Sequence, residues 1–518
     1  MTRPLLFNAF LMNTPSHIQH GQWRHPDAHQ VEFEGLDLWT DLARTLERGL
    51  FDAMFFADVS GLYGPADGVY TDNVHEGLQI PSNDPTVLLG ALAAVTSRIG
   101  LATTSNVMQN HPFNFARQIS TLDHLSKGRI AWNIVTSTQE NAARSFGLDA
   151  LVEHDARYEW AEEYVDVAYK LWEGSWDEDA VLVDRDGGRY SDPAKIHKIH
   201  HVGERYRVEG PHLPAPSPQR TPLLFQAGGS PRGIAFAARH AEAVFIAPPN
   251  PEVARDHIAK TRELAVANGR RADDILFFPG MSFVIGSTEA EARAKEAELL
   301  EYASDTGYIT HASLGIQPDG TRLPADTPLS SIPNNGGRGH VEWLRAGLGR
   351  EPVLGDLARE RMIGRTVTGT PEQIADVLEE WRAAGVDGIN VVNWRLPSSY
   401  EEFIDHLLPT LQERGLAKTE YGEETTLRGR LFGRDRLPDR HPGARYRGAF
   451  GNKGAGESGA ADGEGTASGH DAAPVPASAP ETGAKGTPVS SADDSVNEAA
   501  AGMAPVPSVA ASASPAVK

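Results

Sequence analysis

The stretch TPLLFQAGGSPRGIAFAARHAEAVFIAP (221–248) contains one complete strand–helix–strand unit. Its two ends, 221–228 and 242–248, are short, rich in aliphatic and aromatic residues, and bounded by Pro, Gly or charged residues, which is typical of buried strands. Between them, 230–241 has the apolar spacing of an amphipathic helix. This order predicts a parallel sheet covered by helices.

The same alternation continues through the first 420 residues. The segments with strand character are 5–12, 51–58, 99–106, 129–137, 221–228, 242–248, 275–286 and 387–393. The segments with helical character are 36–49, 84–97, 111–128, 154–174, 230–241, 251–269, 288–303, 370–385 and 399–415. Eight strands, each followed by helical material, predict a (β/α)8 TIM barrel. A doubly wound open sheet is the alternative.

Two inserts and a tail depart from this alternation. We expect a barrel domain over 1–440, interrupted by inserts at about 175–219 and 305–360. From 454 to 518 the chain is rich in Ala, Gly, Ser and Pro and lacks Trp, Tyr and Phe. Such a segment buries too little apolar surface to offset the entropy of ordering, so we expect a disordered, low-complexity tail.

Charge and cysteine content exclude several classes of function. The 70 acidic and 48 basic residues give a formal net charge of −22, which argues against nucleic acid and anionic membranes as partners. The absence of cysteine excludes disulfides, thiolate metal sites and cysteine nucleophiles. The N-terminus has no signal-peptide pattern, and the apolar run 87–95 is too short to span a bilayer, so we expect a cytoplasmic protein.

Small polar residues recur where the predicted strands end. These include Asp58, Thr104, Asn133, Gln226 and Asn393. Loops begin at such positions, so any one of these residues could be incidental. In a TIM barrel, however, the carboxyl ends of the strands meet at the catalytic face. Their recurrence in five strands favours a shared ligand pocket lined by mostly uncharged donors and acceptors.

The turn GGSPRG (228–233) predicts an anion site. Glycines allow close approach of the backbone, and a helix that begins there presents free N–H groups beside the hydroxyl of Ser230. A phosphate monoester fits, carried by a nucleotide-like cofactor or a phosphorylated sugar, although a plain turn is also possible. His154 and Tyr158 lie one helical turn apart and could hold the phosphate from the side. Alternatively, His154 and Asp155 cap the helix and Tyr158 is a core residue.

Other patterns are weaker. The segment HKIHH (197–201) lacks a matching carboxylate pattern, so we expect no metal site. His17, His20 and His25 follow the first strand and are either on the catalytic face or incidental loop residues. No Walker loop, G-x-S-x-G elbow or strand–GxGxxG–helix unit occurs, so the chain lacks its own dinucleotide domain.

Longer motifs resemble one family. These are NAFLMN…WRHP (8–26), LARTLERGLFDAMFFAD (42–58), QISTLDHLSKGRIAWNIVTS (118–137), EHDARYEWAEEY (153–164), KLWEGSWDEDAV (170–181), SDPAKIHKIHHVGERYRVEGP (191–211), PSPQRTPLLFQAGGSPRG (216–233) and YEEFIDHLLPTLQERG (400–415). Together they are similar to bacterial-luciferase-like flavin monooxygenases of the nitrilotriacetate monooxygenase component A type, which include dibenzothiophene-sulfone monooxygenase, dimethylsulfide monooxygenase and pristinamycin IIA synthase. The resemblance covers about residues 5–440.

This resemblance implies a two-component enzyme. A separate NAD(P)H:flavin reductase supplies reduced FMN, which meets O2 on this chain and oxygenates a small organic substrate. The implied flavin contacts are Asp58, Thr104, Asn133, His154, Tyr158, Gly229 and Ser230, with Gly229 and Ser230 at the phosphate. We also expect a homo-oligomer, either a dimer or a tetramer, and no metal.

The substrate is less defined by the resemblance. Members attack C–S bonds, C–N bonds or dehydrogenate, and His17 in the loop TPSHIQHGQ is our candidate for a residue that faces the substrate. Neither insert contains an obvious arginine cluster, which argues against a polyanionic substrate. The alternatives are a deazaflavin-dependent oxidoreductase on the same barrel, a non-catalytic flavin-binding protein and a metal-dependent barrel hydrolase.

Overall fold

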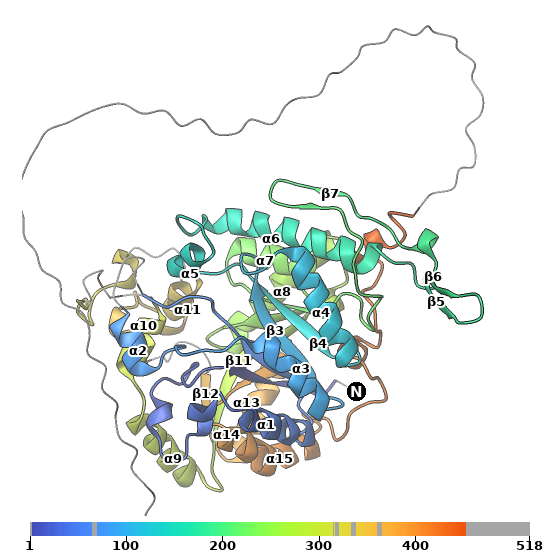
Figure 1. The fold of residues 1–518 in the computed structure, drawn as a ribbon. Helices are drawn as coiled ribbons and strands as arrows, with labels where there is room; N and C mark the ends of the chain where they lie inside the picture. The colour runs from blue at the N-terminus through green and yellow to red at the C-terminus, as the bar shows by residue number, and fades with distance from the viewer. Residues whose placement is uncertain are drawn as a thin grey trace, which may run out of the picture. The chain divides into compact units, whose positions relative to one another are not determined.

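The computed structural model describes residues 3–451, apart from 65–69, 314, 316, 318–320, 333–337 and 360–364. The tail predicted for 454–518 lies outside the described residues. Figure 1 shows the ribbon, in which strands are surrounded by helices.

A closed parallel barrel is the centre of the fold. Eight strands pair side by side in the described residues, and the last strand returns to pair with the first, from Leu6↔Gly388 to Phe10↔Val392. The strands in barrel order are β1 (Leu6–Met12), β2 (Ala53–Ala57), β3 (Gly100–Asn106), β4 (Ile130–Val135), β9 (Leu223–Ala227), β10 (Ala243–Ile246), β11 (Leu276–Ile285) and β13 (Gly388–Val392). This closure confirms the predicted TIM barrel and excludes the open sheet.

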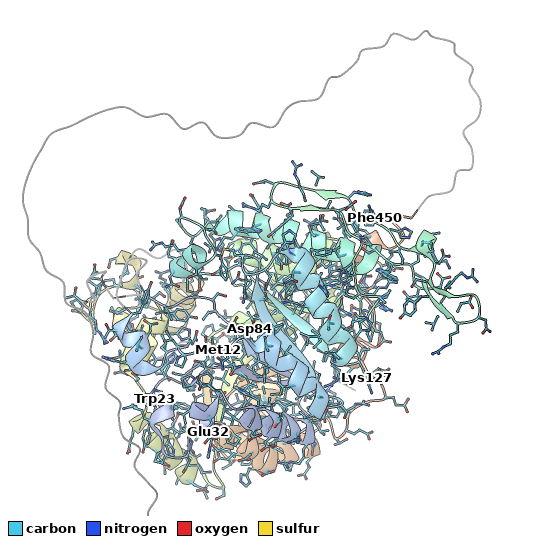
Figure 2. The ribbon with its side chains drawn as sticks, in the orientation of Figure 1. Met12, Trp23, Glu32, Asp84, Lys127 and Phe450 are labelled. Atoms are coloured by element: carbon cyan, nitrogen blue, oxygen red, sulfur yellow. The ribbon has the colours of Figure 1, made fainter. Side chains whose placement is uncertain are left out.

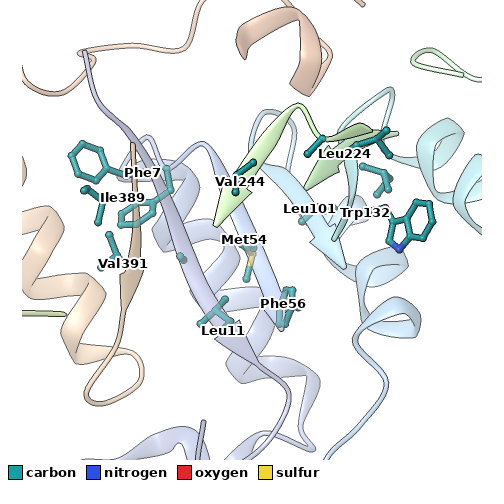
Figure 3. Packing of buried hydrophobic residues seen from close by; sticks show 14 of the residues in the cluster. Phe7, Leu11, Met54, Phe56, Leu101, Trp132, Leu224, Val244, Ile389 and Val391 are labelled. Atoms are coloured by element: carbon teal, nitrogen blue, oxygen red, sulfur yellow. The ribbon is translucent and has the colours of Figure 1, made fainter. Parts of the chain in front are cut away.

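Alternate side chains of each strand enter two separate apolar clusters. The outward-facing residues, such as Phe7 of β1 and Trp132 of β4, pack against the helices (Figure 3). The intervening residues, such as Phe10 of β1 and Phe225 of β9, fill the barrel interior. This period-2 pattern is why strands buried on both faces read as continuous apolar runs.

Helices follow the strands as the alternation predicts. They include α1 (Leu36–Arg48), α3 (Pro85–Val95), α4 (Pro112–Leu125), α6 (His154–Tyr169), α7 (Pro231–His240), α8 (Pro251–Ala267), α9 (Glu289–Glu301) and α13 (Pro371–Ala383). The final helical stretch is divided into α14 (Ser398–Glu402), a π-helical turn at Phe403–Leu407 and α15 (Leu408–Glu413). Met12 and Asp84, which caps α3, lie at one end of the barrel, and Lys127 lies at the other (Figure 2).

Both predicted inserts contain secondary structure. The first holds the hairpins β5 (Val181–Asp184) with β6 (Arg189–Ser191) and β7 (His201–Val202) with β8 (Arg207–Val208); the β5–β6 hairpin projects away from the barrel (Figure 1). The second contains α10 (Asp305–His311), α11 (Arg338–Leu348) and α12 (Leu354–Arg359). Leu344, Leu354 and Leu357 contribute to a small apolar cluster of this second insert, so it has a core of its own.

Among the elements that were not anticipated from the sequence, two bear on the barrel itself. Strand β12 (Arg365–Gly369) pairs with the second half of β11, over Met281–Ile285, as an addition to the barrel. Helix α16 (Leu427–Phe432) places Leu427 and Leu431 in the interior cluster and so covers the amino-terminal ends of the strands. That end is closed by apolar packing, which leaves the carboxyl ends as the open mouth of the barrel.

Candidate functional site

Thr104 and Asn133 lie next to each other at the mouth, as paired residues of β3 and β4. The Thr104 hydroxyl donates to the Phe56 carbonyl at 2.8 Å and accepts a hydrogen bond from Asn133 Nδ2 at 2.9 Å. Asn133 is 5 % exposed, and its Oδ1 is buried with no partner among the described residues. An unpaired buried acceptor is costly, so this atom is suited to receive a hydrogen bond from a bound ligand.

Asp58 follows β2 at the same end of the barrel, and the pKa of its carboxyl group is raised. Burial, reinforced by the negative charge of Asp84, raises its pKa from 3.8 to about 7, against a lowering contribution from the Val59 N–H. Near neutral pH the carboxyl group is therefore partly protonated. It can donate or accept a hydrogen bond at that pH, depending on the ligand.

A second group of residues, here called the phosphate-side cluster, consists of Tyr158, Gly228, Ser230 and Gly233. Tyr158 of α6 is 6 % exposed, and burial raises its pKa, while Ser230, Arg157 and Thr136 oppose the rise. A Cβ placed on Gly228 or Gly233 would lie 3.0 or 2.7 Å from the Tyr158 hydroxyl. Both glycines are therefore required for the phenol to reach the turn before α7.

Ser230 caps α7, and its hydroxyl is also hydrogen-bonded to Tyr158. Its Oγ accepts a hydrogen bond from the Gly233 N–H at 3.1 Å. Gly229 beside it is exposed, and a Cβ there would meet nothing within 4 Å. Within the described part of the chain, the N–H groups of Gly229 and Ser230 have no acceptor. The turn thus offers two backbone donors and one hydroxyl donor near the positive end of a helix, which suits a phosphate.

His154 begins α6 and is partly exposed. Its Nδ1 lies 2.6 Å from Asp155 Oδ1, and its ring meets the Tyr158 ring edge-on, with 5.4 Å between centroids. Glu153, rather than His154 or Asp155, caps the helix, because its carboxylate accepts from the N–H groups of Asp155 and Ala156. The alternative capping role for His154 and Asp155 is therefore wrong, and His154 remains beside the phosphate-side cluster.

His17 belongs to a third group, here called the histidine cluster, with His20 and His311. The Nε2 of His20 lies 2.8 Å from Nδ1 of His311. Burial, with His311 close by, lowers the pKa of His17 to about 3, so its imidazole is neutral at physiological pH. His17 Nδ1 is buried and has no hydrogen-bond partner in the described part of the chain, and the ring packs on Phe10 with 4.7 Å between centroids. His20 and His25 are also buried, so they are not incidental surface residues.

Sequence reasoning missed two residues at the histidine cluster, Tyr63 and His311. Tyr63, in the loop after β2, packs on His311 with 4.5 Å between ring centroids. His311 itself comes from α10 in the second insert. A tyrosine five residues after a strand-end aspartate is a weak signal for Tyr63. No local pattern indicates His311, since its neighbours at the site are distant in the sequence.

The residues at the mouth fit a flavin mononucleotide in chemical terms. The phosphate-side cluster supplies donors for a phosphate, and the free Oδ1 of Asn133 supplies an acceptor for a ring N–H. Among the described residues, no group of three or more His, Asp or Glu side chains could hold a metal ion, and HKIHH is no exception. None of the helices in the described part of the chain has both the length and the apolar character needed to cross a bilayer.

Comparisons with known proteins identify the relatives of this chain. The family model described as luciferase-like monooxygenase matches residues 12–388. The chain is 41 % identical to the long-chain alkane monooxygenase of Geobacillus thermodenitrificans (strain NG80-2), covering 86 % of this chain and 99 % of the relative. It is 40 % identical to the dimethyl-sulfide monooxygenase of Hyphomicrobium sulfonivorans, covering 87 % of this chain and 95 % of the relative.

Two further matches bear on cofactor and partner. Nitrilotriacetate monooxygenase component A of Aminobacter aminovorans is 36 % identical, covering 80 % of this chain and 94 % of the relative. A crystal structure of riboflavin lyase with modified FMN and riboflavin superposes with a TM-score of 0.79 at 36 % identity, covering 86 % of this chain and all of that one. The resemblance predicted from the sequence motifs is confirmed.

Proposed function

Because this chain belongs to the luciferase-like monooxygenase family, and is thus a flavin-dependent monooxygenase, we propose that it uses reduced FMN delivered by a separate reductase. The observation that carries this proposal is the phosphate-side cluster. The hydroxyls of Tyr158 and Ser230 meet at one turn with the N–H groups of Gly229 and Ser230, which have no acceptor in the described part of the chain. A terminal phosphate would receive several charge-assisted hydrogen bonds there. Riboflavin without its phosphate would forgo them.

The remaining mouth residues suit the flavin ring system. Asn133 would accept from a ring N–H, while Thr104 fixes the orientation of the Asn133 amide through their hydrogen bond. Asp58, with a pKa of about 7, would hold or release a proton beside the ring at physiological pH. When bound, reduced flavin supplies the electrons that activate O2; the protein supplies binding, orientation and a dry environment.

We propose that the substrate is a small, largely uncharged organic molecule that enters beside the histidine cluster. Neutral His17 would orient it by hydrogen bonding or contact and would not act as an acid, because its pKa is about 3. Oxygenation at or next to a C–S or C–N bond was our expectation from the motifs, and the dimethyl-sulfide and nitrilotriacetate relatives support it. The alkane relative extends the candidates to unactivated C–H bonds.

The proposed partner is an NAD(P)H:flavin reductase. One relative is named as component A of its enzyme, which supports a system of more than one protein. Reduced FMN would reach this chain by diffusion or by transient contact, so both proteins would share a compartment, for which we propose the cytoplasm. We also propose that the chain assembles as a dimer or tetramer.

Anaerobic titration and isotope labelling test this function together. The purified protein is titrated with reduced FMN, oxidised FMN and reduced riboflavin, and we expect the tightest binding for reduced FMN. Turnover with a flavin reductase, NADH and 18O2 is then followed by mass spectrometry on dimethyl sulfide, dibenzothiophene sulfone and hexadecane. Incorporation of one 18O atom into any product supports the proposal. No preference for reduced FMN, together with no labelled product from a broad panel, overturns it.

A further inference from the structure

The loop that follows β2 is held at the mouth by an asparagine outside the proposed flavin and substrate contacts. Asn141 lies on α5 (Glu140–Ser145). Its Oδ1 accepts from the Leu62 N–H at 2.8 Å, and its Nδ2 donates to the Leu62 carbonyl at 2.8 Å and to the Tyr70 hydroxyl at 2.9 Å. A single amide side chain thus satisfies both backbone groups of Leu62, as a neighbouring strand would.

The approach of Asn141 to this loop depends on a glycine. A Cβ on Gly61 would lie 2.2 Å from Asn141 Oδ1 and 2.9 Å from the Cβ of Ala142. Both distances are steric clashes, and Ala142 is part of helix α5 itself. Even alanine at position 61 would therefore push the loop away from the helix.

The segment 60–64 is also attached on either side of Leu62. Ser60 Oγ accepts from Asn106 Nδ2 at the end of β3, at 3.2 Å. The Gly64 N–H donates to Ser313 Oγ, two residues after α10, at 3.1 Å. Between these attachments, Tyr63 packs on His311 and is largely buried, which raises the pKa of its hydroxyl above the ordinary value. Asn141 provides the central attachment, directly beside Tyr63.

We propose that Asn141 is a positioning residue, which fixes the segment 60–64 so that Tyr63 stays packed against His311 and closes the substrate side of the mouth to water. It lies in the connection between two proposed flavin contacts, Asn133 and His154. Its hydrogen bonds to Leu62, next to Tyr63, attach that connection to the segment that packs on the histidine cluster. The catalytic consequence rests on the proposed function: with the loop loose, reduced FMN and O2 give oxidised FMN and H2O2 in place of oxygenated substrate.

The attachment itself is tested on flavin-free protein. We compare the wild type, Asn141→Ala and Gly61→Ala by hydrogen exchange of the Leu62 and Gly64 amides and by nitration of Tyr63 with tetranitromethane, read by mass spectrometry. We expect exchange and nitration to be at least tenfold faster in both variants. Ser145→Ala is the matched control and should match the wild type, because its hydroxyl donates to the Asn141 carbonyl on the same helix. If Asn141→Ala does not fold, Gly61→Ala carries the comparison.

The positioning role is tested by the yield of product. With a probe that the wild type oxygenates, product formed per reduced FMN consumed should fall at least fivefold in both variants, while the reduced-FMN Kd stays within twofold. Asn141→Asp keeps the acceptor for Leu62 but loses both donors, so its yield should be intermediate. Unchanged exchange and nitration, or an exposed Tyr63 with an undiminished yield, would overturn the proposal. A wild type that oxygenates no probe would instead contradict the proposed function, and the exchange data would still decide the attachment.

Discussion

The phosphate-side cluster and the histidine cluster are assembled from very different distances along the chain. Tyr158 comes from α6, the second helix after β4. The other members come from the turn after the neighbouring strand β9 and from the first residues of α7. His20 and His311, by contrast, are 291 residues apart, and α10 must fold back onto the first loop to join them. The first cluster is a product of the repeating βα unit, whereas the second depends on an insert.

From this difference we infer separate roles for the two clusters. Any barrel of this kind places the turns after adjacent strands side by side, so a phosphate grip can be built from short local motifs. An insert can vary while the barrel remains unchanged, so a surface built partly from one is suited to recognise different substrates. Substitutions in the phosphate-side cluster should therefore affect flavin binding, and those in the histidine cluster should affect substrate turnover.

The largest effect is expected from removing both hydroxyls of the phosphate-side cluster. Ser230→Ala with Tyr158→Phe should weaken reduced-FMN binding by roughly 100-fold, because each hydrogen bond to an ionised phosphate is worth about 1.5 kcal/mol or more. Anaerobic fluorescence titration measures the Kd. Tyr164→Phe on the same helix is the control, since its hydroxyl is buried without a partner among the described residues. An unchanged Kd in the double variant would remove the phosphate assignment.

A smaller effect, confined to the substrate, is expected at His17. His17→Ala should lower kcat/KM for an oxygenated probe by about tenfold, as loss of one orienting contact predicts, and should leave the reduced-FMN Kd unchanged. Because the pKa of His17 is about 3, the wild-type rate should show no His17 titration between pH 5 and 9. Steady-state kinetics across this range make the measurement. Weaker flavin binding in this variant would contradict the separate roles of the two clusters.

Asp58 provides an effect of a different kind, on the free energy of unfolding. Its folded pKa of about 7 exceeds 3.8, so between these values the folded protein keeps a proton that the unfolded chain releases. The stabilisation that this proton gives to the folded protein is therefore complete below pH 3.8. It is lost as the pH rises towards 7, by up to about 1.36 kcal/mol per pH unit. Urea unfolding should show the free energy of unfolding of Asp58→Asn rising, relative to that of the wild type, by roughly 2.5 kcal/mol between pH 5 and 8. A difference in unfolding free energy between variant and wild type that does not change with pH would contradict this prediction.

The smallest effect is expected from the tail, which belongs to neither cluster. A chain ending at residue 453 should keep the wild-type Tm within about 1 °C and the same reduced-FMN Kd, because the tail composition offers little apolar surface to bury. Differential scanning calorimetry and the titration above make the comparison. A drop in Tm of several degrees would show that the tail contributes contacts to the folded chain.

The site residues at strand ends and turns were the easiest to predict from the sequence. Thr104 with Asn133, and Tyr158 with Ser230, lie close together in the structure because parallel strands place their carboxyl ends at one edge. Their roles towards flavin remain predictions. Tyr63, Asn141 and His311 could not be predicted in this way, because their packing depends on loops and an insert whose paths follow no short periodicity.

The sequence by itself determined the barrel, since alternating apolar periods of strand and helix allow few other arrangements. Its motifs also showed a family resemblance, which implies flavin chemistry at the mouth of the barrel. Only the tertiary structure decided which polar groups are left unpaired, which histidines are buried and neutral, and which loop Asn141 holds in place. Local periodicity is set by backbone geometry within a few residues. Burial and pairing depend instead on side chains that meet from distant parts of the chain.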